Sequence, residues 1–244
     1  MERRVMPTNH FSTRPLYLQL RDALAERVAA GEWKPGAAIP NEGDLAREFG
    51  VSAGTMRKAL DLLEDEHLVT RRQGRGTFVN DQNSEELAVR FCNVRKPDGR
   101  RIVSRFRNVR LSEETATEME CARLQIAPKD KVLRAERIRL DQDRPFMVEA
   151  LSIPAALFPE FTASEAGLPH ITELAQRYGI LLGKAEERVS VETASGDIAK
   201  TLGIPVGAPV AVLDRVVFAL DRRPVEWRVG RCHLGAGHYL AEMK

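Results

Sequence analysis

Residues 39–79 read IPNEGDLAREFGVSAGTMRKALDLLEDEHLVTRRQGRGTFV, and this stretch decides the fold of the first part of the chain. A short helix is expected after Asn41, a typical N-cap residue, and it should end at Gly50, which tolerates the left-handed conformation. A second helix is expected after Ser52, because apolar residues then recur at helical spacing: Met56, Ala59, Leu60 and Leu63. Two alternating segments flank the glycine-rich residues 73–76 and predict a hairpin. This order of elements predicts a winged helix-turn-helix, which places its second helix in the major groove of DNA.

The exposed side of the second helix carries the first set of residues expected to contact DNA. It combines small side chains with positive charge, and acids crowd only its C-terminal end, so phosphates would approach the positive end of the helix. These residues are Ser52, Gly54, Thr55, Arg57 and Lys58. The alternative is that Arg57 and Lys58 only form an ordinary solvated face of the helix and do not contact DNA.

The hairpin supplies the second set of candidate DNA contacts. Its glycines permit a tight turn and close backbone approach, and its guanidinium groups suit phosphates and a narrow minor groove. The candidates are Arg71, Arg72, Gln73, Gly74 and Arg75. A hairpin of this kind is a weak signal alone, but its place directly after a helix-turn-helix strengthens the prediction.

Composition limits the other possibilities. The net charge is only +2 over 244 residues, so any positive charge used for DNA binding must be local. Cys92, Cys121 and Cys232 are odd in number and widely spaced, which indicates free thiols rather than a disulfide framework or a zinc site. No apolar run is long enough to span a membrane, and no secretory signal precedes the first helix. We therefore expect a cytoplasmic protein without a metal or other cofactor.

A change of sequence pattern divides the chain. Residues 1–79 form the predicted DNA-binding domain, the polar residues 80–87 the predicted linker, and residues 88–244 a second domain. In the second domain, the pattern predicts strands at 101–111, 132–140, 145–153, 185–193, 210–220 and 224–233, and helices at 113–124, 170–178 and 197–202. Mostly antiparallel strands with interspersed helices indicate an α+β domain, in a chain of mixed α/β class.

The first domain resembles the DNA-binding domain of the GntR family of bacterial repressors. The resemblance covers residues 15–79 and rests on the runs Leu45-Ala46, Phe49-Gly50-Val51-Ser52, Ala59-Leu60 and Gly76-Thr77-Phe78-Val79. It implies that Ser52, Thr55 and Arg57 contact the operator from the second helix. It also implies that Gly74 and its neighbours enter the minor groove.

Three positions depart from the pattern of that family. Gly43 and Ala53 stand where family members have arginines that contact DNA, which should weaken the salt-dependent part of binding. His67 replaces the glycine that usually ends the second helix, at a left-handed position that histidine tolerates with modest strain. DNA binding is still expected, but the bases of the operator are not predictable.

The second domain resembles the UTRA effector-binding domain of the HutC-like branch of the same family. The resemblance rests on a set of loose motifs in a fixed order: Arg137-x-Arg139, Glu149, Tyr178-Gly179, Arg215 and Pro224-Val225-Glu226. It implies a fold similar to chorismate lyase, with Arg137, Arg139, Glu149 and Glu226 lining a pocket for a small acidic effector. Pro169, His170 and Ile171 replace a serine-containing run expected at the rim of this pocket.

Strand alternation supports part of this site. Arg137 and Arg139 share one face of a strand, where two guanidinium groups can converge on one carboxylate or phosphate. Arg228, two residues from Glu226, is expected to point into the same space as a third cation. Three cations favour a strongly anionic ligand, such as a di- or tricarboxylate or a phosphorylated compound. The alternative is a solvated sheet face on which arginines and glutamates alternate.

These expectations combine into a ligand-operated repressor. A two-fold protein matches a palindromic double-stranded operator, so we expect a homodimer whose main contacts lie in the second domain. A small anionic effector would shift the spacing of the DNA-binding heads and release the operator. The alternatives are an enzyme on the chorismate-lyase-like scaffold, with Glu149 as its acid or base, and a DNA binder without an effector. Glu149 has no nucleophile partner and the histidines lack metal-ligand spacing, which favours a regulator.

Overall fold

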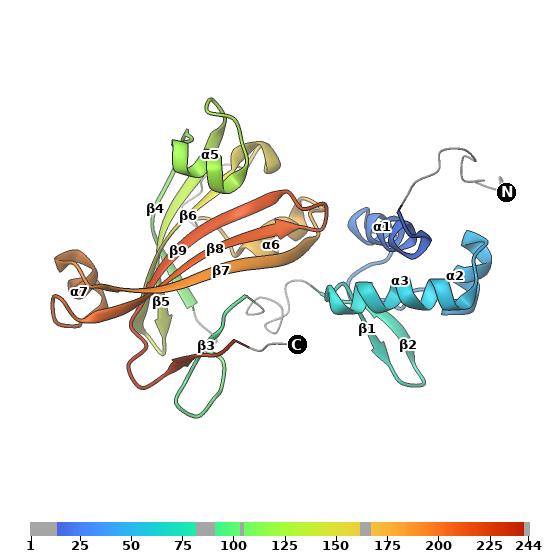
Figure 1. Ribbon diagram of the computed structural model, residues 1–244, viewed down its shortest axis with the longest axis horizontal. Coiled ribbons are helices and arrows are strands. Elements are labelled where there is room, and N and C mark those ends of the chain that lie inside the picture. The colour runs from blue at the N-terminus through green and yellow to red at the C-terminus, as the bar shows by residue number, and fades with distance from the viewer. Residues whose placement is uncertain (1–13, 82–90, 103–104, 162–166, 242–244) are drawn as a thin grey trace. The chain divides into compact units, whose positions relative to one another are not determined.

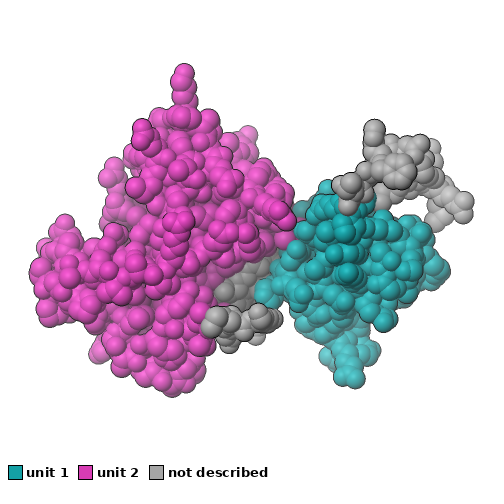
Figure 2. All heavy atoms as spheres, in the orientation of Figure 1, with its two compact units in different colours: residues 1–80 teal, residues 81–244 magenta. Residues whose placement is uncertain are grey.

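The computed structural model describes residues 14–81, 91–102, 105–161 and 167–241. The chain divides into two compact units, Met1–Asn80 and Asp81–Lys244, which Figure 2 shows in different colours. Most of the predicted linker, residues 82–87, lies outside the described residues. Within the described part of the chain, no helix is long and apolar enough to cross a membrane.

The first unit begins with three helices, α1 (Leu16–Ala29), α2 (Glu42–Phe49) and α3 (Ala53–Asp65). The predicted N-caps form, because Asn41 accepts a hydrogen bond from the backbone N–H of Asp44 at 2.9 Å and Ser52 accepts one from Thr55 at 3.2 Å. Both α1 and α2 pack against α3. Their contacts bury a small apolar core made of Leu20, Leu24, Leu45, Met56, Leu60 and Leu63.

A hairpin of β1 (Val69–Arg72) and β2 (Gly76–Val79) follows α3. Its register pairs Arg72 with Gly76 and leaves Gln73, Gly74 and Arg75 in the turn. His67 lies between α3 and β1 with a φ of 58°, which confirms the left-handed conformation predicted for it. The winged helix-turn-helix predicted from residues 39–79 is therefore present (Figure 1).

The second unit is built on a six-stranded antiparallel sheet with the order β4-β5-β6-β9-β8-β7. The strands are β4 (Arg105–Thr115), β5 (Lys131–Asp141), β6 (Arg144–Pro154), β7 (Leu182–Thr193), β8 (Pro209–Ala219) and β9 (Pro224–Cys232). Two short strands, β3 (Val94–Arg95) and β10 (His238–Tyr239), form a separate pair. This arrangement confirms the predicted α+β class.

Two of the three predicted helices of the second unit are shorter in the structure than the sequence predicted, and the third begins one residue earlier. They are α5 (Glu118–Leu124), α6 (Ile171–Arg177) and α7 (Gly196–Leu202), and a 3-10 turn η1 (Ala155–Leu157) follows β6. The helix predicted at 113–124 was wrong over its first residues, because β4 continues to Thr115, which pairs with Lys131. Thr117 then starts α5 with a capping box: its hydroxyl accepts from the backbone N–H of Glu120, and the Glu120 carboxylate accepts from the backbone N–H of Thr117.

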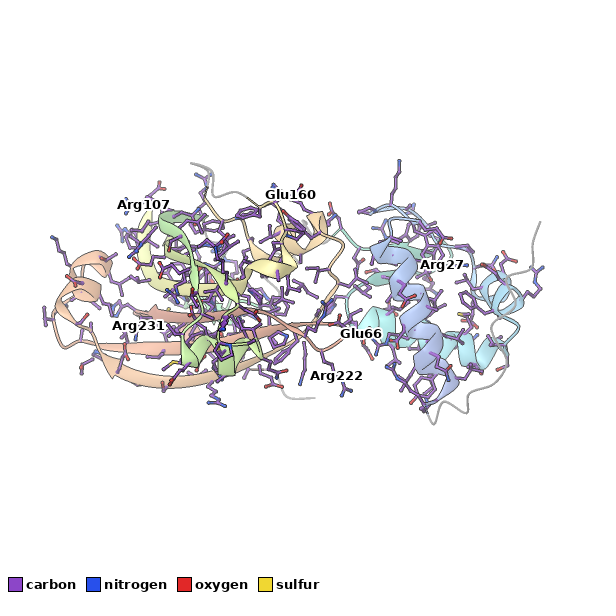
Figure 3. The ribbon with its side chains drawn as sticks, turned by 90° about the horizontal axis from the view of Figure 1, so that it is seen from above. Arg27, Glu66, Arg107, Glu160, Arg222 and Arg231 are labelled. Atoms are coloured by element: carbon purple, nitrogen blue, oxygen red, sulfur yellow. The ribbon has the colours of Figure 1, made fainter. Side chains whose placement is uncertain are left out.

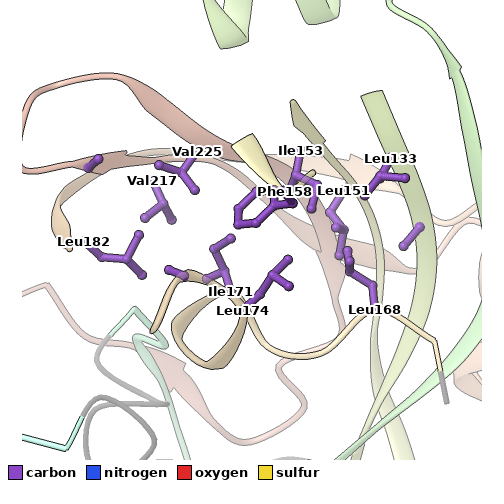
Figure 4. Packing of buried hydrophobic residues seen from close by; sticks show 13 residues of the cluster. Leu133, Leu151, Ile153, Phe158, Leu168, Ile171, Leu174, Leu182, Val217 and Val225 are labelled. Carbon is purple, nitrogen blue, oxygen red and sulfur yellow. The ribbon is translucent and has the colours of Figure 1, made fainter. Parts of the chain in front are cut away.

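The two faces of the sheet are covered by different elements. On one face, α6 packs its Ile171 and Leu174 onto Leu151 and Val217, as Figure 4 shows, and forms the larger apolar cluster. On the other face, α5 contacts β6 and β9, and α7 contacts β6. A second apolar cluster lies farther along the first face and includes Met147, Leu213, Cys232 and the segment from Cys92 to Val94.

Strand alternation places a row of charged residues between these two apolar clusters. Along β5, for example, Leu133 and Ala135 belong to the larger cluster, and Arg137 and Arg139 continue the same face. Along β6, Glu149 lies between Leu151 and Met147 in the same way. Charged side chains flanked by apolar packing on both sides make this part of the face the candidate ligand site.

Candidate DNA-binding surface and effector site

The N-terminal turn of α3 presents most of the residues predicted to read DNA. Ser52, Gly54, Arg57 and Lys58 are exposed, and Thr55 is half-buried. The hydroxyls of Ser52 and Thr55 lie 2.8 Å apart and form a hydrogen bond beside the capping interaction. The helix therefore offers small polar groups and unpaired backbone N–H groups at its positive end.

The two cations of α3 already have partners within the first unit. Arg57 donates two hydrogen bonds to the carboxylate of Glu42 on α2, at 3.1 and 2.9 Å. The ammonium group of Lys58 lies 3.9 Å from the centroid of the Tyr17 ring on α1. Both side chains remain exposed, so these contacts orient them without removing them from the surface.

The three arginines of the wing have different environments. Arg75 is exposed in the turn beside Gln73 and Gly74, whereas the Arg72 guanidinium stacks 4.8 Å from the centroid of the Phe78 ring. Arg71 pairs with Asp61 and Glu64 and donates a hydrogen bond to the carbonyl of Arg57. Arg71 therefore holds β1 against α3, which differs from the cluster of three phosphate-binding arginines expected from the sequence.

In the second unit, the structure brings all the predicted effector-site residues together. Arg137 and Arg139 on β5, Glu149 on β6, and Glu226 and Arg228 on β9 are each 2–3% exposed. Two further residues join them: Arg215 on β8, which is 3% exposed, and Glu187 on β7. We call these seven residues the arginine–glutamate cluster. Their burial excludes the solvated sheet face that was the alternative at the sequence level.

Ion pairs link the cluster across five strands, β5, β6, β9, β8 and β7. Glu149 lies 3.0 Å from Arg228, 3.8 Å from Arg139 and 3.9 Å from Arg137. Arg215 lies 3.8 Å from Glu226 and 4.0 Å from Glu187, and Arg228 lies 3.4 Å from Glu187. Arg228 donates hydrogen bonds in the two shorter pairs, whereas the other four separations exceed hydrogen-bond length, so most of the opposite charges face one another without a direct contact.

Burial and neighbouring charges within the cluster shift the pKa values of Glu149 and Arg215. Burial raises the pKa of Glu149, but the charges of Arg228, Arg139 and Arg137 outweigh it and bring that pKa to about 2. Burial, together with the charge of Arg228, lowers the pKa of Arg215 to about 10. Glu149 is therefore an anion, and Arg215 a cation, at every physiological pH.

Several polar atoms of the cluster have no hydrogen-bond partner among the described residues. They are the Nε atoms of Arg137, Arg215 and Arg228, and one carboxylate oxygen of Glu226. Buried donors and acceptors of this kind cost about 1–3 kcal/mol each when they stay unpaired. A ligand with complementary oxygens and hydroxyls would satisfy them.

The rim residues that departed from the family pattern lie against the cluster. The carbonyl of Pro169 accepts a hydrogen bond from Arg137 at 2.9 Å. His170 contacts Thr172 through its Nδ1 at 3.0 Å. Burial and the nearby charges of Arg139, Arg137 and Arg215 lower the pKa of His170 well below its ordinary value. This histidine is therefore a neutral polar group at the rim and adds no charge to the cluster.

The first described segment after residue 90 also touches the cluster. Arg215 donates a hydrogen bond to the carbonyl of Phe91, and its guanidinium lies 5.5 Å from the centroid of the Phe91 ring. Tyr239 on β10 donates a hydrogen bond of 2.6 Å to Glu187 and accepts one of 3.0 Å from Asn93. We call residues 91–95 the strap. Two separate contacts therefore attach the strap to charged residues of the cluster.

The opposite face of the sheet carries a different set of ion pairs. Glu120 of α5 accepts hydrogen bonds from Arg134 at 2.6 and 2.7 Å and from Ser152 at 2.6 Å. Arg231 on β9, labelled in Figure 3, pairs with Glu192 on β7, across the intervening strand β8. These direct pairs fasten the helices and strands together, whereas four of the six pairs in the cluster are longer than a hydrogen bond.

A winged helix-turn-helix joined to an antiparallel sheet with a buried charged site defines a DNA-binding regulator with an effector domain. Comparison with known families agrees: residues 16–79 match the bacterial regulatory proteins of the gntR family, and residues 99–235 match the UTRA domain. The chain therefore belongs to the GntR family of bacterial regulators and carries a UTRA domain.

Relatives and solved structures support this assignment. The chain is 29% identical to the mannosyl-D-glycerate transport/metabolism system repressor of Escherichia coli, over 88% of this chain and 90% of that protein. It is 30% identical to the transcriptional repressor NagR of Bacillus subtilis, over 87% and 88% of the two chains. A GntR-family regulator from Enterococcus faecalis aligns with 57% of this chain and all of its own, with 27% identity and a TM-score of 0.52. The regulator YydK of Bacillus subtilis shares the fold over 92% of this chain and 99% of its own, at a TM-score of 0.58 and 15% identity.

These relatives decide between the classes of function left open by the sequence. They are transcriptional regulators, and the prediction of a regulator rather than an enzyme is confirmed. The chain is thus a DNA-binding transcriptional regulator of the repressor type with a UTRA effector-binding domain.

Proposed function

We propose that this protein is a cytoplasmic homodimeric repressor whose affinity for its operator falls when a small anionic metabolite binds the arginine–glutamate cluster. The observation that carries the proposal is the cluster itself, in which three buried guanidinium Nε atoms and a carboxylate oxygen of Glu226 have no partner among the described residues. Buried polar groups without partners lower the stability of a domain unless a ligand forms hydrogen bonds with them. Residues 1–79 would serve as the DNA-binding domain and residues 88–244 as the effector and dimerisation domain.

The proposed DNA contacts come from α3 and the wing. On α3 they are Ser52, Gly54, Thr55, Arg57 and Lys58, and on the wing they are Arg72, Gln73, Gly74 and Arg75. Arg71 would act indirectly, because its pairs with Asp61 and Glu64 fix the angle between the wing and α3. Gly43 and Ala53 supply no cation, so Arg75 and the positive end of α3 would carry more of the phosphate contact.

The proposed effector contacts come from three arginines and two glutamates predicted from the sequence, together with Arg215. The guanidinium groups of Arg137, Arg139, Arg215 and Arg228 would bind the anionic group of the ligand as charge-assisted hydrogen-bond donors. Glu149 and Glu226 would orient these arginines or accept ligand hydroxyls. The separations of 3.9 Å between Arg137 and Glu149 and of 3.8 Å between Arg215 and Glu226 support this role, since these two pairs are longer than a hydrogen bond.

The strap supplies a route from this site to the linker. Arg215 holds the carbonyl of Phe91, ten residues after Asp81, the first residue of the second unit. A ligand oxygen at Arg215 would compete with that carbonyl, and a changed position of Glu187 would loosen Tyr239 and Asn93. Ligand binding would therefore shift the N-terminal segment of the second unit. Through this segment it would change the spacing of the two DNA-binding domains in the dimer.

A dimer is supported by the open edge of the sheet. The outermost strand β7 exposes Val189 and Val191, whose side chains are 49% and 73% accessible. Unpaired strand edges with apolar side chains are surfaces on which a second chain can add. A two-fold dimer would match a palindromic operator with two half-sites.

The proposal is tested by measuring operator release. DNA selected from a random library by the purified protein supplies the operator, and fluorescence anisotropy reports its binding. Addition of a panel of hydroxy acids, sugar acids and sugar phosphates is expected to include compounds that release the DNA. The proposal fails if the compounds that bind the protein leave operator affinity unchanged, or if neutral sugars alone cause release.

A further inference from the structure

The two edge strands of the six-stranded sheet differ in regularity. At one edge, β4 has a bulge between Asn108 and Arg110. At the other edge, β7 runs from Ala185 to Thr193 in an unbroken register with β8 (Figure 1). A bulge twists an edge strand away from any further strand, whereas a regular edge presents a row of backbone N–H and C=O groups. The sheet is therefore better suited to accept another strand at β7 than at β4.

The middle of β7 is open to solvent on both faces of the sheet. Four consecutive residues are exposed: Arg188, Val189, Ser190 and Val191. Because successive side chains of a strand point to opposite faces, the two valines share one face and the arginine and serine share the other. Val191 is 73% accessible, and residues 185–193 contain no proline to block pairing. This segment combines an apolar face with a regular edge.

We propose that β7 pairs antiparallel with β7 of a second copy of this chain, in the register that places Ser190 opposite Ser190 of the partner subunit. This inference rests on the proposed homodimer and specifies which residues meet in it. Directly opposed residues of antiparallel strands point to the same face, so a two-fold axis perpendicular to the sheet requires one residue to face itself. Only a few registers meet this condition.

The register centred on Ser190 matches side chains on both faces of the sheet. On one face, Val189 lies opposite the partner's Val191, and the symmetry repeats this apolar pair. On the other face, Arg188 lies opposite the partner's Glu192, and this pair also occurs twice. Cross-strand pairs of β-branched residues and of opposite charges both stabilise a sheet.

Neighbouring registers lack this match. A centre one residue nearer the N-terminus places Glu186 opposite the partner's Glu192. A centre two residues nearer places Arg188 opposite its own counterpart, and like charges directly opposed destabilise a sheet. A centre one residue nearer the C-terminus brings no opposite charges together. Among centres 188–191, only Ser190 joins opposite charges without opposing like ones.

The two charged residues are available for this contact. Within the described residues, Arg188 forms no ion pair. Glu192 pairs with Arg231 through Oε1, and its Oε2 accepts no hydrogen bond from the described part of the chain. The Glu192 side chain is 38% exposed. One oxygen of Glu192 can therefore receive a guanidinium group from a second chain while the other keeps Arg231.

The loop that follows α7 extends the apolar surface beyond the end of β7. Gly207 donates a hydrogen bond of 2.9 Å to the carbonyl of Ala194, the residue after β7. Val206 in this loop is 73% accessible. In the proposed register, the partner's β7 runs past Ala194, so this valine lies beside the path of the added strand.

Cross-linking of the full chain tests the register. Opposed residues of antiparallel strands have Cα atoms about 4.5–5.5 Å apart, which a disulfide can span. Ser190→Cys is therefore expected to form a covalent dimer when diamide oxidises it, as seen by non-reducing electrophoresis. Glu186→Cys is the control, because eight positions separate it from its counterpart, roughly 26 Å. The unsubstituted protein reports any background from the three native cysteines.

A charge exchange tests the ion pairs independently. Arg188→Glu and Glu192→Arg each oppose like charges in their own homodimers, whereas a mixed dimer restores opposite charges at both positions. Sedimentation is expected to show a dimer dissociation constant at least tenfold higher for each variant alone and recovery in the equimolar mixture. Glu192→Arg also loses the pair with Arg231, so thermal unfolding checks that both variants fold.

The outcomes separate the register from the proposed dimer. If the unsubstituted protein is dimeric but Ser190→Cys does not cross-link, or Glu186→Cys cross-links as well, the register is overturned and the homodimer stands. Failure of folded charge variants to recover when mixed overturns the ion pairs and the register with them. A protein that binds its operator as a monomer contradicts both the register and the proposed dimer.

Discussion

Arg57 and Glu42 are joined by two hydrogen bonds, from Nε to Oε2 at 3.1 Å and from Nη2 to Oε1 at 2.9 Å. The pair connects α3 to α2 and fixes the direction of the guanidinium group on the exposed surface of the helix-turn-helix. A side chain held in place before binding loses less entropy when it meets a base or a phosphate. The carboxylate of Glu42 also keeps one negative charge close to the DNA-binding surface.

The first prediction concerns this pair. Arg57→Ala should weaken binding to a selected operator by about tenfold or more, the effect typical of a lost specific contact. Glu42→Gln should raise affinity for random-sequence DNA, because it removes a carboxylate that repels phosphates, and thereby reduce discrimination. Anisotropy titrations against operator and random duplexes measure both. Equal affinities of Arg57→Ala and the unsubstituted protein for the operator would refute the assigned contact.

The second prediction separates two arginines of the wing. Arg75→Ala should leave stability unchanged, weaken all DNA binding and reduce the slope of log K against log salt by about one. Arg71→Ala should instead lower the free energy of unfolding by about 1 kcal/mol, because it breaks a network with Asp61 and Glu64. Urea unfolding and salt-dependent anisotropy distinguish them. The assignment is wrong if Arg75→Ala destabilises the fold more than Arg71→Ala does.

The third prediction is a pH dependence of stability at Glu120. Burial raises the pKa of this carboxyl, but hydrogen bonds from Arg134, Ser152 and Thr117 outweigh burial and bring the pKa to about 2. A lowered pKa means that the carboxylate stabilises the fold above its unfolded pKa of 4.5, and this stability is lost as the pH falls toward 2.

Substitution of Glu120 should expose this dependence. Glu120→Gln is expected to cost about 2 kcal/mol of unfolding free energy at neutral pH, and the cost should shrink in acid. Glu118→Gln, at an exposed position of the same helix, is the control. A cost for Glu120→Gln that does not change with pH would contradict the prediction, because it would indicate lost packing and not lost charge.

The fourth prediction concerns the strap. Tyr239→Phe removes the hydroxyl that bridges Glu187 and Asn93 but keeps the ring. We expect the variant to bind the releasing metabolite within about threefold of the normal Kd, because the hydroxyl contacts no unsatisfied atom of the cluster. The metabolite should nevertheless change operator affinity less than in the unsubstituted protein. Calorimetry measures metabolite binding, and anisotropy measures operator release. If the metabolite releases the operator from the variant as fully as from the unsubstituted protein, the strap takes no part in the response.

Local signals made the first unit predictable from the sequence. The caps at Asn41 and Ser52, the turn at Gly50 and the helical spacing behind them depend on neighbours only a few residues away. The same applies to the hairpin around Gly74. The environment of Arg71 was not predictable in this way, since its partners Asp61 and Glu64 lie across a turn whose geometry the sequence does not show.

Long-range pairing explains what the sequence did not predict in the second unit. Thr115 belongs to β4 because it pairs with Lys131, and this partner overrides the local helical pattern. Arg215 joins the cluster because the register of β8 and β9 places it opposite Arg228. Glu187 joins it because β7 pairs it with Arg215. Alternation alone indicated Arg137 and Arg139 as neighbours, but only the order of the strands shows what faces them.

The central claim is that the arginine–glutamate cluster controls DNA binding without taking part in it. Its most direct test is an anisotropy titration of labelled operator with Arg137→Ala, in the absence and presence of the metabolite that releases the unsubstituted protein. Arg107→Ala, an exposed arginine of β4, serves as the control. We predict that Arg137→Ala binds the operator with nearly normal affinity and no longer releases it when the metabolite is added. Normal release by Arg137→Ala, or a parallel loss of operator binding in a folded variant, would contradict the account.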